Sequence, residues 1–233
     1  MSIKKKYRRL IRLLIVLLAV AIAFWGYVEI VNLNSSSMTV RQKVLKAVYP
    51  ALTGIKRLLG RSAIILSNDK NIPPAQSFYD LTVTLNTGVA LKFSELKGKK
   101  VLLVNTASDC GYTAQYGELQ ELYEQEKGKL FIIGFPSNDF KQQEKGNDEE
   151  IAEFCKKNFG ITFPLAIKNG VRKGNSQQQV FQWLTDKTRN GWNEKQPSWN
   201  FSKYLINEQG VLINYFDPSI SPLGDKVKKA IDL

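Results

Sequence analysis

The first 31 residues contain one long apolar stretch that follows a cluster of basic residues. The run from Leu13 to Val28 holds 16 residues without a charge. A membrane-spanning helix needs about 20 apolar residues, and flanking Lys and Arg side chains can extend a shorter run by reaching toward the headgroups. The pattern therefore predicts a single transmembrane helix within residues 1–31. Ala21 and Ala23 also fit the end of a cleaved signal peptide, so that alternative stays open.

Residues 32–76 change to a basic and amphipathic pattern that ends in a linker. Apolar residues recur at helical spacing, and every charged residue between 38 and 61 is basic. This is typical of a helix that lies on an anionic membrane surface, and it fits a stalk or a helix packed on a folded domain equally well. Pro50 is expected to kink or divide this helix. The Pro- and Asn-rich stretch 68–76 is typical of a linker, which puts the start of the folded domain at residue 77.

From residue 77 onward the pattern changes to short alternation and to buried runs. Alternating apolar residues at 81–85 and 89–93 predict a hairpin, and the continuous runs VLLVN and LFIIGF predict buried strands. Helices are expected at 116–127, from 147, at 177–186 and from 222, and a strand pair at 203–206 and 211–216. This order predicts a thioredoxin-like α/β fold, a central mixed sheet flanked by helices.

The positive charge of the chain is confined to its N-terminal part. Residues 1–61 hold 12 Lys and Arg against one acidic residue, a net charge of +11, whereas residues 62–233 carry only +1. A nearly neutral domain does not favour nucleic acid as a partner. Under the positive-inside rule the basic N-terminus stays cytoplasmic, so the domain is expected on the periplasmic or extracellular side.

The chain has no histidine and only two cysteines, 45 residues apart. The absence of histidine excludes Ser-His-Asp and Cys-His nucleophile activation and most zinc sites. No CxxC motif or metal-ligand cluster is present, so we expect neither a metal nor a cofactor. The two cysteines are either free thiols or one long-range disulfide.

Cys110 lies in the stretch NTASDCGYTAQY, after a predicted buried strand and before a predicted helix. A thiol at this position is expected to lie near backbone N–H groups and the positive end of the helix dipole, which favour the thiolate. Cysteine is also among the most commonly buried residues and can simply fill space in a core. Position alone does not decide between a nucleophile and a core residue.

Three stretches of the chain together resemble the glutathione peroxidase family. They are VNTASDCGYTAQY, GFPSNDFKQQEKGNDEEIAEFC and WNFSKYLINEQG, and they follow one another in the family's order and at matching spacing. The resemblance covers about residues 75–233. It implies a thioredoxin-like fold and the reduction of hydrogen peroxide and of organic or lipid hydroperoxides in the response to oxidative stress.

The resemblance also implies roles for five residues. Cys110 matches the peroxidatic cysteine, and Gln143, Trp199 and Asn200 match catalytic positions whose N–H groups can donate to a thiolate and to peroxide oxygens. Taken singly, Trp199 would suit a core and Gln143 a polar surface. Cys155 matches the resolving cysteine of the branch reduced by thioredoxin. The implied cycle runs from a sulfenic acid to a disulfide that an external dithiol reduces, and it requires local unwinding around Cys155.

Several positions depart from the family pattern. Asp109 stands where a Lys is common, and a carboxylate beside the thiol should raise the pKa of that thiol. Lys141 and Gln142 replace a Gly-Gly pair. The short span from Pro164 to Trp199 lacks the insertion of tetrameric, glutathione-using members, which implies a monomer with a thioredoxin-like reductant rather than glutathione.

The sequence therefore predicts a membrane-anchored thiol peroxidase with three parts. Residues 1–31 form the anchor or signal peptide, residues 32–76 a basic amphipathic helix and linker, and residues 77–233 the peroxidase domain. Two other functions fit the same features: a peroxide sensor that relays its disulfide to a partner, and a non-catalytic membrane-anchored binding protein.

Overall fold

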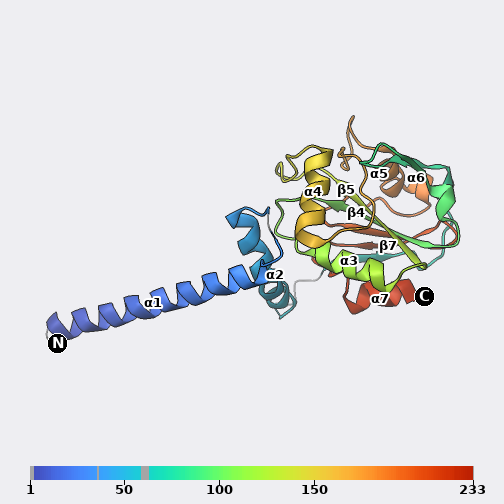
Figure 1. Cartoon of the computed structure of the whole chain (residues 1–233). Coiled ribbons are helices and arrows are strands. Elements are labelled where there is room, and N and C mark those ends of the chain that lie inside the picture. Colours follow the sequence, from blue (N-terminus) through green and yellow to red (C-terminus); the bar gives the residue numbers. More distant parts are fainter. Residues whose placement is uncertain (1–2, 36, 59–62, 233) are drawn as a thin grey trace.

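We describe the protein from a computed structural model, which covers residues 3–35, 37–58 and 63–232. A long N-terminal helix projects from a compact α/β domain, and a second helix lies where the two meet (Figure 1). Part of the predicted basic helix, including Arg61, and the first two residues of the predicted anchor lie outside the described residues.

The projecting helix α1 runs over Ile3–Val31, and its stretch Tyr7–Val31 is long and apolar enough to cross a membrane. Apolar side chains such as Leu18 and Ile22 are exposed, whereas Val28 near the end of the helix is buried. The end of α1 packs on α2, Val40–Leu58, where the Tyr27 hydroxyl donates to the carbonyl of Ala47 at 3.2 Å. Exposed apolar side chains surround most of α1. Such a surface is typical of a helix that crosses a membrane.

A five-stranded mixed sheet forms the centre of the domain, with strand order β1-β7-β6-β4-β5. β4 pairs with β5 in parallel and with β6 antiparallel, and β7 and β1 extend the sheet in antiparallel fashion. All seven residues of β4 are buried, as a central strand covered on both faces requires. The strands are β1 Ile65–Ser67, β4 Lys100–Thr106, β5 Leu130–Pro136, β6 Lys203–Ile206 and β7 Leu212–Phe216.

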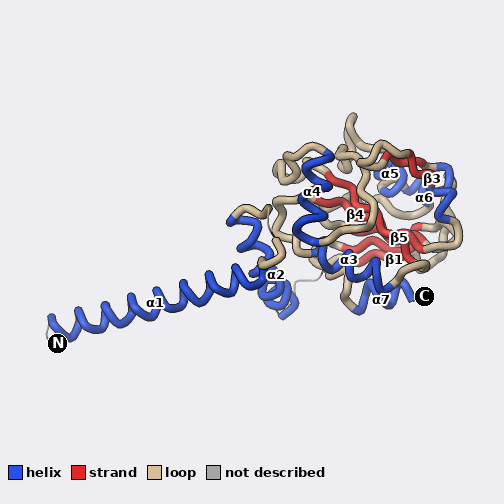
Figure 2. The backbone as a smooth tube through the Cα atoms, in the orientation of Figure 1, coloured by secondary structure: helices blue, strands red, loops and turns tan. Residues whose placement is uncertain are grey.

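Helices cover both faces of this sheet (Figure 2). Leu102 and Val104 of β4 share one hydrophobic core with buried residues of α3, α4 and α7, while Leu103 on the opposite face shares the other core with α5. A two-stranded hairpin, β2 Thr82–Thr84 with β3 Ala90–Lys92, adds to this second core. The remaining helices are α3 Gln115–Gln125, α4 Asp148–Phe159, α5 Gln179–Leu184, α6 Lys187–Asn190, α7 Asp225–Asp232 and the short 3₁₀ turns Phe78–Asp80 and Phe93–Leu96.

The thioredoxin-like architecture and every predicted strand of the domain are confirmed, with three differences at the element level. Helix α2 continues through Pro50, so this proline does not divide it. Helix α3 begins at Gln115, near the predicted start, so Cys110 lies in the turns and bend of residues 108–114 and not at the helix N-terminus whose dipole was expected to act on it. The sheet also takes in β1, which lies before residue 77 and within the stretch that the sequence suggested to be helix and linker.

Candidate active site

Cys110 lies in the turns that connect β4 to α3, and its side chain is 1% exposed. The Thr113 hydroxyl accepts a hydrogen bond from the Cys110 amide at 3.0 Å and lies 2.7 Å from the Cys110 carbonyl oxygen, which fixes the turn. The Tyr112 amide donates to the Cys110 sulfur at 3.4 Å. A backbone N–H therefore points at the sulfur, as the position after a buried strand indicated.

The loop before β6 brings two more donors to the thiol. The side chains of Trp199 and Asn200 lie close enough to Cys110 to lower the pKa of its thiol. Asn105, at the end of β4, holds this loop: its amide group donates to the Trp199 carbonyl at 3.1 Å and its side-chain oxygen accepts from the Ser202 amide at 3.0 Å. The donors are thus positioned by the same strand that leads into the cysteine turn.

Gln143 joins this group through its hydrogen bond with Asn200. The Asn200 Nδ2 donates to Gln143 Oε1 at 3.0 Å, and the Gln143 carbonyl accepts from the amide of Asp109 at 3.0 Å. Asn200 Oδ1 is buried and has no hydrogen-bond partner among the described residues. The four predicted residues Cys110, Gln143, Trp199 and Asn200 are therefore together, although 90 positions of sequence separate the first from the last.

The loop that carries Gln143 adopts an unusual backbone conformation. Lys141 and Gln142, which stand in place of a Gly-Gly pair, both have φ of 51°. Left-handed conformations are uncommon for residues with a Cβ atom. Two residues of this loop contact Trp199 of the loop before β6. The Phe140 ring packs on Trp199 with 5.4 Å between the ring centroids, and the Lys141 ammonium lies 5.8 Å from the Trp199 ring centre.

The environment raises the pKa of the Cys110 thiol above its ordinary value. Burial is the largest cause, and the nearby carboxylate of Asp109 adds to it, while the Tyr112 amide and the side chains of Trp199 and Asn200 act in the opposite direction. These groups favour the thiolate, as the position of Cys110 indicated, but desolvation outweighs them and the net shift is upward. The expected direction of the Asp109 effect is confirmed.

Cys155 is 1% exposed on α4 and forms no disulfide with Cys110. Asn147 and Glu150 form a capping box that starts this helix, and Gly160 ends it in a left-handed conformation. Burial raises the pKa of the Cys155 thiol to about 12, and the nearby Tyr116 opposes this only in part. Both thiols border the same hydrophobic core, but Cys155 is enclosed within a regular helix.

The sequence reasoning missed Glu144, which follows Gln143 and is 1% exposed. Its carboxylate accepts from the Ser108 amide at 2.9 Å and from the Ser108 hydroxyl at 3.1 Å, so it ties the loop before α4 to the turn that holds Cys110. Burial raises the pKa of Glu144 to about 7, and the two Ser108 donors only partly oppose this. A charged residue in the polar run KQQEKGN gives no sign of burial, which is why it was not singled out.

Replacing Glu144 by Gln is expected to make stability less dependent on pH. The folded pKa, about 7 against an ordinary value of 4.5, is raised, so this group stabilises the fold fully below pH 4.5 and loses that contribution as pH rises through about 7. Glu144→Gln should therefore gain up to about 3 kcal/mol relative to the unmodified chain between pH 5 and pH 8. Chemical denaturation at both pH values measures this, with the exposed Glu153→Gln as control. A difference that does not vary with pH would contradict it.

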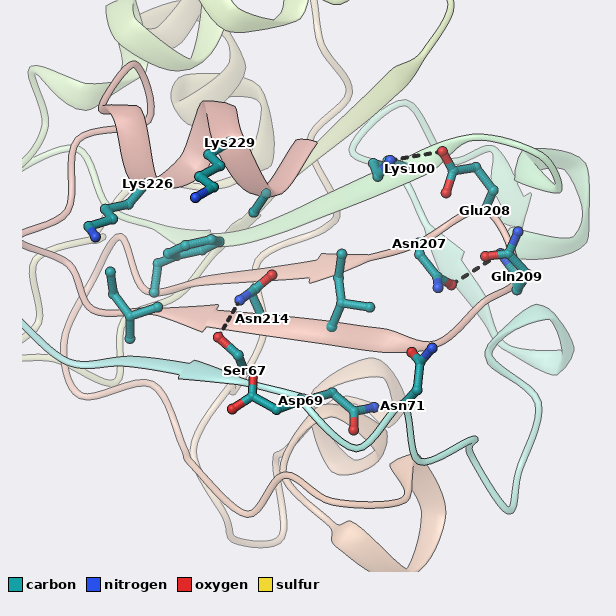
Figure 3. Close-up of a pocket in the computed structure, with 15 residues that line it drawn as sticks. Ser67, Asp69, Asn71, Lys100, Asn207, Glu208, Gln209, Asn214, Lys226 and Lys229 are labelled. Carbon is teal, nitrogen blue, oxygen red and sulfur yellow. Dashed lines mark hydrogen bonds and ion pairs between the residues drawn. The ribbon is translucent and has the colours of Figure 1, made fainter. Parts of the chain in front are cut away.

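Two surface hollows bear on where a ligand could approach. One of about 530 Å³ lies against Trp199 and is lined also by Phe140, Arg172 and Lys195. Another, of about 680 Å³, lies between β1, β7, the turn before β7 and α7, and many of its polar groups already pair with each other, including Lys100 with Glu208 and Asn214 with Ser67 (Figure 3). The first hollow adjoins the candidate site, and the second contains none of its residues.

Comparison with known proteins shows that this chain is similar to glutathione peroxidases and their homologues. The sequence model of the family described as glutathione peroxidase matches residues 78–185, a range that includes Cys110 and Cys155 and stops before Trp199. The chain is 44% identical over 158 residues to the glutathione peroxidase homolog BsaA of Staphylococcus epidermidis, covering 67% of this chain and 98% of that protein.

Two further relatives extend these matches. The glutathione peroxidase-like peroxiredoxin gpx1 of Schizosaccharomyces pombe is 47% identical over 146 residues, covering 62% of this chain and 91% of its own length. The crystal structure of Trgpx in its apo form superposes with a TM-score of 0.52 and 32% identity, covering 68% of this chain and 97% of its own. The family match begins at residue 78, so α1, α2 and β1 lie outside it.

Proposed function

Because this chain belongs to the glutathione peroxidase family and is a peroxidase-type oxidoreductase, we propose that it reduces hydroperoxides through Cys110 and resolves the oxidised cysteine with Cys155. The observation that carries this proposal is the convergence of three segments, which hold Cys110, Gln143 and the pair Trp199 and Asn200, at one buried thiol. The Tyr112 amide donates to the Cys110 sulfur, and the side chains of Trp199 and Asn200 lie close enough to lower the pKa of the thiol.

In the first step the Cys110 thiolate attacks the terminal oxygen of the hydroperoxide. An S–O bond forms, the O–O bond breaks, and the departing alkoxide or hydroxide takes up a proton, leaving a sulfenic acid on Cys110. Donors that favour the thiolate also stabilise the charge that moves to the leaving oxygen. The buried and unpartnered Oδ1 of Asn200 is an acceptor for the hydroperoxide O–H, and the hydrogen bond to Gln143 sets the orientation of the Asn200 amide.

In the second step the Cys155 thiol ionises and its thiolate attacks the sulfenic sulfur; an S–S bond forms, the S–O bond breaks, and the departing hydroxide takes up a proton and leaves as water. The Cys155 thiol is buried within α4 and its pKa is raised to about 12, so it has to leave this environment before it can ionise. We therefore propose that α4 unwinds around Cys155 during each cycle. An external dithiol then returns two electrons to the disulfide and regenerates both thiols.

The proposed reductant is a thioredoxin-like dithiol, and the proposed substrates are hydrogen peroxide and organic or lipid hydroperoxides, consumed in the response to oxidative stress. The support is the presence of a second cysteine in α4 and the similarity to proteins named as peroxiredoxins. We further propose that the protein acts as a monomer and that its partners do not include nucleic acid.

We propose that α1 remains attached as a membrane anchor, with the domain on the periplasmic or extracellular side. The length of the apolar stretch Tyr7–Val31, which is sufficient to cross a membrane, supports an uncleaved helix. The basic residues before Leu13 favour a cytoplasmic N-terminus. The reductant would then have to be available on the far side of the membrane.

A turnover assay with two reductants in parallel tests the proposed function. The full chain in detergent micelles is appropriate, because β1 precedes the predicted domain start and a shortened chain could lose it. We expect sustained consumption of a hydroperoxide with thioredoxin and much slower consumption with glutathione. A single stoichiometric oxidation would instead indicate a peroxide sensor, and no thiol oxidation would indicate a binding protein.

A further inference from the structure

The helix α2, which lies outside the family match, contacts the turn that holds Cys110. Arg41 of α2 pairs with the carboxylate of Asp109 and also donates to the Asp109 carbonyl at 3.1 Å. The next residue, Gln42, donates to the Ser108 carbonyl at 3.0 Å. Further along α2, the ring of Tyr49 meets the ring of Tyr112 edge to face. The helix therefore binds the residues immediately before Cys110 and contacts one that follows it.

This contact joins the membrane-proximal part of the chain to the candidate site. The end of α1 packs on α2, and α2 in turn lies against the α/β domain (Figure 1). Nearby, Ser37 exchanges two hydrogen bonds with Asn158 of α4, the helix that carries Cys155. Among the charged residues of α2 whose side chains are described, Arg41 reaches Asp109 and Lys43 reaches Glu29 of α1.

The carboxylate of Asp109 raises the pKa of the Cys110 thiol, because a negative charge beside the sulfur disfavours the thiolate. A guanidinium paired with that carboxylate reduces its field at the sulfur, and it also keeps the carboxylate turned toward α2. Another charged group interacts with Asp109: the carboxylate of Glu144, which also interacts with the ammonium of Lys168. Arg41 is the cation that contacts Asp109 directly.

We propose that Arg41 is a positioning residue of the peroxidatic site, which offsets the charge of Asp109 and so keeps the Cys110 thiol reactive. This inference rests on the proposed function in assigning Cys110 as the nucleophile. It adds to that function a residue from outside the matched family region, supplied by the segment between the anchor and the domain. The Asp109 carboxylate disfavours the Cys110 thiolate, and the guanidinium of Arg41 on α2 offsets part of this effect.

The pKa of the Cys110 thiol, measured from the pH dependence of its alkylation by iodoacetamide, tests the inference. Alkylation is measured in the full chain with Cys155→Ser, so that a single thiol reacts. Arg41→Gln is expected to raise this pKa by about 0.2 to 0.7 units and to slow alkylation at pH 7 by about two- to five-fold. This range corresponds to the interaction free energy typical of an exposed ion pair. Arg41→Lys should retain most of the effect. Lys43→Gln, which removes a neighbouring cation of the same helix, should leave the pKa unchanged.

A second substitution separates charge compensation from a merely structural role. In the Arg41→Gln chain, Asp109→Asn is expected to bring the thiol pKa back to its original value or below, because the field that Arg41 offset is no longer present. An unchanged pKa in Arg41→Gln, or a raised pKa that Asp109→Asn does not correct, would overturn the inference. The readout does not depend on turnover, so an inactive peroxidase that still shows these shifts would refute the proposed function and leave the role of Arg41 intact.

Discussion

Cys110→Ser is expected to abolish peroxide consumption, with a fall in turnover of at least about 10³-fold. A serine hydroxyl is not ionised near neutral pH and cannot form a sulfenic acid, so the first step is lost. The donors around the sulfur, Trp199 and Asn200, remain in place and cannot substitute for it. The measurement is steady-state consumption of hydrogen peroxide by the full chain with thioredoxin in excess.

The Cys110 result is interpretable only if the substituted chain folds. Serine is close to cysteine in size, and the hydrogen bonds that hold this turn come from Thr113 and the backbone rather than from the sulfur. Thermal unfolding should therefore change little. A folded Cys110→Ser chain that consumed peroxide at the original rate would contradict the role of Cys110.

Cys155→Ser is expected to separate the two half-reactions. The first oxidation of Cys110 should proceed, because Cys155 is not bonded to that sulfur, whereas turnover with thioredoxin should fall to the level of a sample without the enzyme. The reason is that Cys110 is only 1% exposed, so a sulfenic acid formed there offers a protein dithiol little access. Stopped-flow oxidation and steady-state turnover on the same sample measure the two steps.

A matched variant controls for packing around Cys155. The thiol lies in the core beside Ile151 and near Tyr116, so both Cys155→Ser and Cys155→Ala should be compared, one polar and one apolar. Both should lose turnover and both should keep the first oxidation. Full thioredoxin-dependent turnover in either variant would show that Cys155 does not resolve the sulfenic acid.

Sequence patterns were sufficient to predict the fold of the domain and the residues that gather around Cys110. The run VLLVN is apolar at every position because β4 is covered on both faces, and its length identifies a strand. Trp199 and Asn200 could be named only because their segment resembles a family motif, since no periodicity links them to Cys110. Their proximity arises from pairing of β6 beside β4, which a local pattern does not encode.

Other features depend on tertiary contacts that leave no local signal. β1 has only three residues and is stabilised by pairing with β7, so alternation over its length is too short to detect. The net rise in the pKa of Cys110 could not be predicted, because the extent of burial cannot be judged from a neighbouring helix. The contact between Arg41 and Asp109 joins residues in different segments, and the basic pattern of α2 fitted a membrane surface equally well.

Intact-mass analysis after one equivalent of hydrogen peroxide tests the central claim most directly. The full chain, reduced beforehand and then freed of reductant, is treated once, digested without reduction and mapped for its two cysteines. The proposed cycle predicts the loss of two hydrogens and a peptide pair joined through Cys110 and Cys155, with both thiols free in the untreated sample, as in the structure. Two cysteines that remain free, or an oxidised Cys110 beside a free Cys155, would contradict it.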